Sequence, residues 1–321
     1  MCPTFFEVKK MKKLQMIRDD FLTLEEGCNK YLDNCRARNL REGTINHYRQ
    51  SYVQFAKFFD MQMAVSDIDE KLYQKYVVFL RETLHNDVSI NAYLRDFITT
   101  MHFLMNEGYL PHFKMKAIKV DRTGVETYTD AELIKLLKKP NIKTCKFLEY
   151  QAWVMTNFLF STAVRQRSLR YIKIKDVDFD NSVIYVTVTK NRKPLIVPFN
   201  KTLSGILQEF LKYRQHKSDE AFLFCNVFGD QLSKSTSYGM LYSYNKRRGV
   251  ETTGIHRYRH TFAKQWILNG GNVVSLSKLL GHSSLQITQN YVNLLVSDVA
   301  KEVENINLLD KFAARSKMTM R

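Results

Sequence analysis

Two short stretches in the C-terminal half of the chain decide the fold: HRYRHTFA at residues 256–263 and LLGHSS at residues 279–284. In the first stretch, His256 and Arg259 are three residues apart. That spacing places both side chains on one face of a predicted helix. A histidine and an arginine that share a helix face can act together on one ligand.

The second stretch predicts a helix, a turn and a new helix. Gly281 is typical of the residue that follows the last turn of a helix, and Ser283 with Gln286 predicts a capping box that starts the next helix. The turn between them is expected to hold His282 in a fixed direction. Tyr291 follows nine residues after that histidine.

Two further segments lie upstream of these stretches. The box STAVR at residues 161–165 ends in Arg165, after a predicted helix over about 148–160. Residues 182–189 are rich in Val, Ile, Tyr and Thr and predict a strand, with residues 195–197 as its partner. Lys190 lies in the turn that joins the two strands.

The order and spacing of these segments resemble the catalytic domain of the tyrosine recombinase (phage integrase) family, which includes the Xer recombinases, Cre and the integrases of phages and conjugative transposons. The similarity runs from about residue 127 to 296, and residues 20–108 resemble the helical, SAM-like core-binding domain of that family. The expected fold is mainly α-helical, with a small antiparallel β-sheet in a mixed α/β catalytic domain.

The resemblance implies how a DNA strand would be cut. Tyr291 would attack the scissile phosphate, leaving a 3′-phosphotyrosyl link and a free 5′-OH. His256 would move the tyrosine proton, and Lys190 would protonate the departing 5′ oxygen. Such an exchange conserves bond energy and needs neither ATP nor a metal, so we expect no cofactor and no metal site.

The remaining family positions would bind the phosphate. Arg165 and Arg259 would clamp its non-bridging oxygens, because fixed guanidinium groups stabilise the charge of a pentavalent transition state. His282 would hydrogen-bond another phosphate oxygen. These three, with Tyr291, Lys190 and His256, complete the predicted catalytic set.

Two departures from the family pattern and one alternative bear on this assignment. The first box commonly reads Thr-Gly-Leu-Arg, and this chain has TAVR at residues 162–165. The family usually has Glu or Asp three residues after that arginine, where this chain has Ser168. The turn around Lys190 also offers Arg192 and Lys193, which are alternatives for the proton donor.

The charge of the chain also favours a nucleic-acid partner. The chain carries 49 Lys and Arg against 32 Asp and Glu, a net charge of +17, which favours a polyanion partner. Residues 1–127 hold 19 basic and 17 acidic side chains, so residues 128–321 carry a net +15.

Five cysteines without a CxxC pair argue against a disulfide framework or a zinc site. Neither a signal peptide nor a membrane-spanning stretch is expected, which favours a cytoplasmic, nucleoid-associated protein of prokaryotic type.

The N-terminal part of the sequence predicts a series of helices. Thr23 with Glu26 predicts a capping box, and a row of aromatic residues from Tyr48 to Phe59 reads as the buried face of a second helix rather than a base-stacking platform. Further helices are expected over about 69–84 and 89–106. The predicted organisation is a basic extension, a core-binding domain, a linker, a catalytic domain and a C-terminal helix that could dock on a neighbouring protomer: 1–20, 21–108, 109–128, 129–298 and 299–321.

We therefore expect a site-specific recombinase that binds duplex DNA as a homotetramer on synapsed sites and works through a Holliday junction. Integration, excision or resolution of a mobile element or replicon, with an accessory bending or directionality factor, would fit. Two alternatives stay open. A type IB topoisomerase shares the tyrosine chemistry, although the helical domain and the LGH box argue against it. A DNA-binding protein that lost catalysis shares the fold, although the complete catalytic set argues against that.

Overall fold

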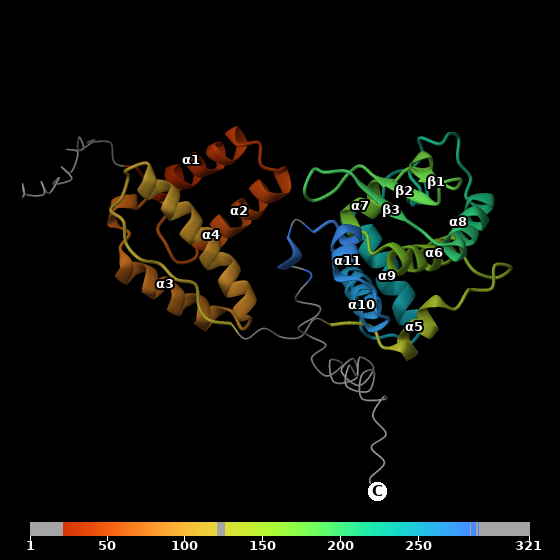
Figure 1. Ribbon diagram of the computed structural model, residues 1–321. Coiled ribbons are helices and arrows are strands. Elements are labelled where there is room, and N and C mark those ends of the chain that lie inside the picture. Colours follow the sequence, from red (N-terminus) through yellow and green to blue (C-terminus); the bar gives the residue numbers. More distant parts are fainter. Residues whose placement is uncertain (1–21, 121–125, 283, 287, 289–321) are drawn as a thin grey trace, which may run out of the picture. The chain divides into compact units, whose positions relative to one another are not determined.

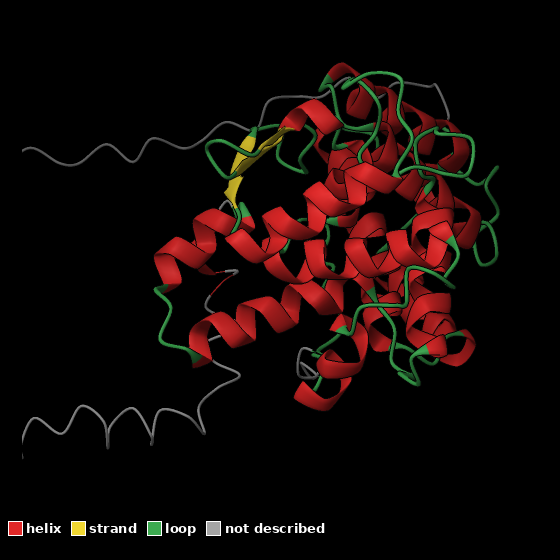
Figure 2. Ribbon diagram, turned by 90° about the vertical axis from the view of Figure 1, so that its right-hand side faces the viewer, coloured by secondary structure: helices red, strands yellow, loops and turns green. Residues whose placement is uncertain are grey.

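A computed structural model describes residues 22–120, 126–282, 284–286 and 288. They form two compact units, one from the residues up to 122 and one from the residues after it (Figure 1). Helices dominate both units, and the described strands make one small sheet in the second (Figure 2). The predicted fold class is confirmed. No helix in the described ranges is long and apolar enough to cross a membrane.

The first unit is built from helices whose starts the sequence encodes locally. Its elements are α1 (Leu24–Ala37), α2 (Glu42–Phe55), the 3-10 turn η1 (Val65–Asp67), α3 (Glu70–Thr83) and α4 (Asp87–Asn106). The predicted capping box is present: the Glu26 N–H donates to Thr23 Oγ1 at 3.2 Å, and the Thr23 N–H donates to the Glu26 carboxylate at 3.0 Å. Asp69 and Asn86 cap α3 and α4, because their side-chain oxygens accept bonds from the first-turn N–H groups.

Aromatic side chains fill the centre of this unit. Tyr52 and Phe55 of α2 are buried, and so is Phe59, which lies just beyond the end of that helix. Phe97 of α4 stacks on Phe59, with ring centroids 5.1 Å apart, and meets Phe55 edge to face at 5.3 Å. The prediction that this row is core is confirmed.

The segment after α4 packs along the same unit without regular secondary structure. Leu110 is buried, Tyr73 Oη donates to the Lys116 carbonyl at 2.8 Å, and Asn91 Nδ2 donates to the Ile118 carbonyl at 2.9 Å. Part of the range 109–128, predicted as a linker, therefore packs against the first unit.

The second unit contains the small sheet and the remaining helices. Its elements are α5 (Asp130–Leu137), α6 (Phe147–Thr162), α7 (Gln166–Tyr171), η2 (Ile174–Asp176), β1 (Val177–Asp178), β2 (Val183–Val186), β3 (Leu195–Pro198), α8 (Lys201–Tyr213), α9 (Lys234–Arg247), α10 (Ile255–Leu268) and α11 (Val273–Leu280). A second capping box, Thr129 with Glu132, opens α5.

The sheet is antiparallel in the order β1-β2-β3, and Tyr185 pairs with Ile196. The predicted strand within 182–189 and its partner at 195–197 are confirmed as β2 and β3. The strand β1 has only two residues, too few to show an alternating pattern in the sequence.

The helix α6 lies at the centre of this unit and packs against α5, α8, α9 and α10. It is buried on nearly every side, which fits its low content of charged residues. Its C-terminal end at Ala163 leads directly into Arg165 and α7. The central helix thus delivers one predicted catalytic arginine to the neighbourhood of α10, which carries the other.

Candidate active site

Arg259 of α10 is fixed by the ends of two other helices. It is only 5% exposed; its Nη1 donates to the Ala163 carbonyl at 2.7 Å and its Nη2 donates to the Leu280 carbonyl at 2.6 Å. These carbonyls lie at the C-terminal ends of α6 and α11, where unpaired peptide oxygens carry partial negative charge. The guanidinium is therefore held in one orientation by backbone, which is the arrangement that a preorganised phosphate clamp needs.

Both helix ends close with a residue in the left-handed conformation. Ala163 has φ 51° and Gly281 has φ 57°, so the predicted role of Gly281 as a helix C-cap is confirmed. A Cβ on Gly281 would lie 3.4 Å from Leu195 Cδ2 and 3.9 Å from Arg165 Nη1, so the turn also brings backbone close to the other arginine. Arg165 is the N-cap residue of α7, two positions after the end of α6.

The hydrogen bonds of His282 define its tautomer. Its Nε2 lies 2.9 Å from Arg259 Nη2, and arginine has only donors, so Nε2 must accept. The proton then sits on Nδ1, which donates to Thr288 Oγ1 at 2.8 Å. Burial and the charges of Arg259 and Arg165 lower the pKa of His282 to about 4. The ring is neutral at neutral pH, and Thr288 is fully buried.

The turn between β2 and β3 is held at several points. Ser168 Oγ of α7 donates to the Val188 carbonyl at 2.8 Å, and Thr189 Oγ1 donates to the Lys193 carbonyl at 2.7 Å. Asn191 Nδ2 lies 3.4 Å from the Gly281 carbonyl. We call residues 189–193 the basic turn. Its cationic side chains are exposed: Lys190, Arg192 and Lys193.

A cavity of about 310 Å³ lies between these parts. Its polar lining includes Arg165, Arg259, His282 and Lys193, and its apolar lining includes Leu195. The cations and hydrogen-bond donors in this lining make the cavity suited to an anionic ligand such as a phosphate group.

His256 borders this cluster from the N-terminal end of α10. His256 is an exposed residue, yet desolvation by the surrounding protein lowers the pKa of its imidazole first, and the charges of Arg259, Arg165, Lys190 and Lys234 lower it further. The ring is consequently biased toward its neutral form, which can accept a proton. Lys190 contributes to this field although its side chain is exposed.

The structure brings five of the six predicted catalytic residues into one neighbourhood. Arg165, Arg259 and His282 line the cavity, and His256 and Lys190 interact with that group through charge. Tyr291 and Ser283 lie outside the described residues. The capping box of Ser283 with Gln286 therefore stays a prediction. The Gln286 N–H donates to Ser284 Oγ at 3.1 Å.

Sequence reasoning missed several residues that support this site. Thr288 orients His282, and the carbonyls of Ala163 and Leu280 orient Arg259. No motif marks a backbone carbonyl as a partner. The one available signal was Ala163, which occupies a position where the family commonly has glycine; a glycine there is typical of a left-handed helix end.

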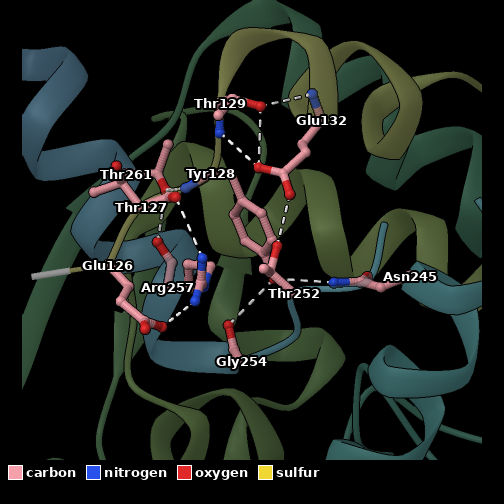
Figure 3. A network of polar contacts seen from close by, with 10 residues as sticks. All are labelled: Glu126, Thr127, Tyr128, Thr129, Glu132, Asn245, Thr252, Gly254, Arg257 and Thr261. Atoms are coloured by element: carbon pink, nitrogen blue, oxygen red, sulfur yellow. Dashed lines mark hydrogen bonds and ion pairs between the residues drawn. The ribbon is translucent and has the colours of Figure 1, made fainter. Parts of the chain in front are cut away.

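A polar network holds the start of α10 to the first residues of the second unit (Figure 3). The Tyr128 N–H donates to Thr261 Oγ1 at 2.8 Å, and Tyr128 Oη donates to the Gly254 carbonyl at 3.4 Å. Asn245 Nδ2 donates to Tyr128 Oη at 2.9 Å. The buried Tyr128 thus connects the entry of the chain into this unit with both ends of the segment that carries His256.

Arg257, the neighbour of His256, belongs to the same network. It pairs with the Glu126 carboxylate, lies 3.4 Å from the Thr127 carbonyl, and its guanidinium stands 5.6 Å from the centre of the Tyr128 ring (Figure 3). Because His256 and Arg259 flank this anchored region of α10, the network contributes to the placement of both.

An arginine held by two helix ends, a second arginine beside it, histidines with lowered pKa values and a basic hairpin turn make this site suited to bind a phosphate group. Residues 127–297 match the model of the phage integrase family, and residues 23–120 match the phage integrase SAM-like domain. The chain belongs to the phage integrase family, the tyrosine recombinases. It is an enzyme of DNA cleavage and religation, and its class of reaction is site-specific recombination.

Curated relatives agree with this assignment, and solved structures share the fold. Tyrosine recombinase XerD of Listeria monocytogenes is 27% identical over 282 residues, covering 83% of this chain and 93% of the relative. The Tn1549 transposon integrase in complex with circular intermediate DNA has a TM-score of 0.68 at 20% identity, over 83% of this chain and 94% of that chain. A lambda integrase tetramer bound to a Holliday junction has a TM-score of 0.69 at 15% identity, over 85% and 78%.

Proposed function

We propose that this enzyme cuts DNA by attack of Tyr291 on the scissile phosphate, with Arg165, Lys190, His256, Arg259 and His282 as its catalytic partners. Tyr291 Oη forms a bond to phosphorus and gives its proton to His256. The bond between phosphorus and O5′ breaks, its electron pair stays on O5′, and Lys190 Nζ supplies the proton that makes a 5′-OH. Religation runs the same steps in reverse.

The observation that carries this proposal is the geometry around Arg259. Its guanidinium is buried, is bonded to the ends of α6 and α11, and shares a cavity with Arg165 and His282. A clamp that is already oriented stabilises the extra charge of the transition state without reorganising. Removing one such donor from an enzyme typically costs about 10²- to 10³-fold in rate.

The histidines support the assignment of proton transfer. His256 has a lowered pKa, so it is available as a base near neutral pH. His282 uses Nε2 to accept from Arg259 in the free enzyme. A bound phosphate would compete for Arg259, and its negative charge would favour a proton on Nε2, which could then donate to a phosphate oxygen.

Chain length supports Tyr291 as the nucleophile of its own site. Thr288 is buried and bonded to His282 within the same chain. Three further residues span at most about 11 Å when extended. This short separation supports the proposal that Tyr291 attacks the phosphate bound by Arg165 and Arg259 of the same chain.

For the biological role, we propose integration, excision or resolution of a mobile element or replicon in the cytoplasm, by a homotetramer that synapses two DNA sites. The relatives support this by analogy: one is a transposon integrase with a circular intermediate DNA and another is a tetramer on a Holliday junction. The net charge of +15 over residues 128–321 suits duplex DNA. An accessory bending or directionality factor would fit such a system.

Covalent trapping tests the mechanism and finds the site together. Wild type and Tyr291→Phe are incubated with nicked duplexes taken from the DNA that flanks the gene and with a randomised nicked pool, with EDTA and without ATP. The expected result is a denaturant-resistant protein–DNA band with wild type only, whose DNA is then sequenced. Tight DNA binding without such a band would favour a catalytically silent DNA-binding protein. Relaxation of a plasmid without the trapped site would favour topoisomerase activity.

A further inference from the structure

The short helix α7 connects two parts of the proposed active site. It begins directly after Arg165, and its third residue, Ser168, is only 5% exposed. Ser168 Oγ donates to the Val188 carbonyl at 2.8 Å, across 20 residues of sequence. Val188 lies two residues before Lys190. One hydroxyl group therefore joins the helix that starts at a phosphate-binding arginine to the segment that carries the proposed proton donor.

This bond acts where the sheet gives no support. The pairing of β2 with β3 ends at Val186 and Leu195, so residues 187–194 lie outside the described ladder. Within that stretch, Thr189 Oγ1 closes the basic turn onto the Lys193 carbonyl at 2.7 Å, and Asn191 reaches the α11 end at 3.4 Å. The bond from Ser168 sets where the closed turn begins relative to α7.

We propose that Ser168 is a positioning residue for protonation of the leaving group: it holds the backbone at Val188 so that the basic turn presents Lys190 to the phosphate bound by Arg165. The inference rests on the proposed role of Lys190. When the bond between phosphorus and O5′ breaks, the electron pair stays on O5′ and takes a proton from Lys190 Nζ. A displaced turn leaves this proton too far from O5′.

The residue type matters because the partner is a carbonyl. A carbonyl oxygen only accepts, so the side chain at position 168 must donate. A serine hydroxyl can donate, whereas an ionised carboxylate, common at this position in the family, cannot. Ser168 also lines the cavity, and threonine keeps the hydroxyl donor while it adds one methyl group. Ser168→Thr is therefore a conservative variant, and Ser168→Ala removes the donor alone.

A pair of substrates isolates the protonation step. The duplex recovered by covalent trapping is prepared with its ordinary scissile phosphate and with sulfur in place of the bridging 5′ oxygen. A thiol has a pKa of about 8.5, so the sulfur leaves as a thiolate and needs no proton. Single-turnover cleavage by the full chain is measured on both substrates.

We expect Ser168→Ala to cleave the ordinary phosphate roughly tenfold or more slowly, a part of the about 10²- to 10⁴-fold that a placed acid contributes. It should cleave the sulfur substrate at nearly the wild-type rate. Ser168→Thr should behave as wild type on both. Thr189→Val replaces the hydroxyl with a methyl group of similar size, so it removes the bond that closes the basic turn. This variant should repeat the pattern of Ser168→Ala.

Matched variants distinguish a failure of this inference from a failure of the proposed role of Lys190. Ser237→Ala removes another buried serine hydroxyl of the same unit, whose described bonds are to Lys234 and Gln166, and should change both rates by the same factor. Lys190→Ala and Lys193→Ala are tested alongside. Rescue of Lys190→Ala by sulfur supports the proposed donor, and rescue of Lys193→Ala alone reassigns the acid and removes the basis of the inference.

If Lys190→Ala is rescued but Ser168→Ala is equally slow on both substrates, or equally fast on both, the positioning role is wrong and the proposed function stands. Thermal unfolding and DNA binding of each variant are measured in parallel. A Ser168→Ala protein that does not fold leaves Thr189→Val to decide: a loss without sulfur rescue would overturn the inference.

Discussion

The two units of this chain bury polar groups in opposite ways. In the helical unit, residues 22–120, the buried carboxylate of Asp96 has a raised pKa, chiefly from burial, and it interacts with Ser51 and His47. In the catalytic unit, the buried guanidinium of Arg259 is bonded to backbone at two helix ends. The first arrangement joins two helices, α2 and α4. The second keeps a charge oriented toward a cavity. The comparison teaches that burial alone does not identify a functional group, whereas a buried charge that also lines a cavity does.

The largest expected effect is on the cleavage rate, and it comes from comparing substitutions of two buried arginines of the catalytic unit. Arg259→Ala should slow single-turnover cleavage by about 10²- to 10³-fold. Arg259→Lys should rescue little of it, because one ammonium group cannot replace a planar fork that reaches two carbonyls. Both rates are measured on the trapped duplex.

Arg214 is the matched control. It is also buried, and it bonds to the carbonyls of Leu223, Phe222 and Gln215. Arg214→Ala should lower the free energy of unfolding by about 1–3 kcal/mol for each carbonyl left unsatisfied, with little change in cleavage per folded molecule. A comparable loss of chemistry in both variants would mean that the orientation of Arg259 has no special role.

A smaller effect is expected at Thr288, which extends the comparison to a neutral side chain. Thr288→Val removes the acceptor of His282 Nδ1 and should slow cleavage about tenfold, the equivalent of one hydrogen bond of roughly 1–1.5 kcal/mol. Thr288→Ser keeps the hydroxyl and should restore the rate. Nitrogen-15 NMR of the imidazole should show the Nδ1–H tautomer in wild type and a mixture in Thr288→Val; an unchanged tautomer would contradict the assignment.

How much of the site the sequence predicts depends on the separation of its partners. The capping box of Thr23 with Glu26 and the left-handed Gly281 were predictable because their geometry is set within a few residues. The bonds of Arg259 to Ala163 and Leu280 were not, because they span 96 and 21 residues and end on backbone atoms. Motif spacing placed the catalytic side chains on their elements; what orients them came only from tertiary structure.

We expect a fall in pH to affect the stability of the two units in opposite directions. Burial lowers the pKa of His260 and of His282 to about 4, below the value of about 6.5 expected in an unfolded chain. Between these values the unfolded state binds more protons, so the catalytic unit loses stability as pH falls. Asp96 acts in the other direction: its raised pKa makes the folded state bind more protons, so its contribution to the helical unit becomes more favourable as pH falls.

Hydrogen exchange at pH 7 and pH 5, corrected for intrinsic rates, measures this contrast within one chain. Peptides of the catalytic unit that surround His282 should lose protection on acidification, and peptides of α2 and α4 should keep it. An equal loss in both units would show that other groups dominate their response to pH.

The smallest effect is expected at Ala163, where two terms nearly cancel. Its φ of 51° costs an alanine roughly 1 kcal/mol relative to glycine. Its methyl group is fully buried, and losing it costs about 0.8 kcal/mol. Ala163→Gly should therefore change the free energy of unfolding by less than about 1 kcal/mol, measured by urea denaturation. A larger loss would show that packing around this helix end, rather than its backbone conformation, sets its energy.

The network around Tyr128 also has a consequence for biosynthesis. Its bond to Thr261 joins residues 133 positions apart, and the bond of Thr252 to Glu132 spans 120. At about 5–20 residues per second, the ribosome needs roughly 6–27 s to make the later partner after the earlier one. The helix that carries His256 and Arg259 cannot reach its anchored state until most of the chain exists. A nascent or prematurely terminated polypeptide is thereby kept from assembling a competent cutting centre.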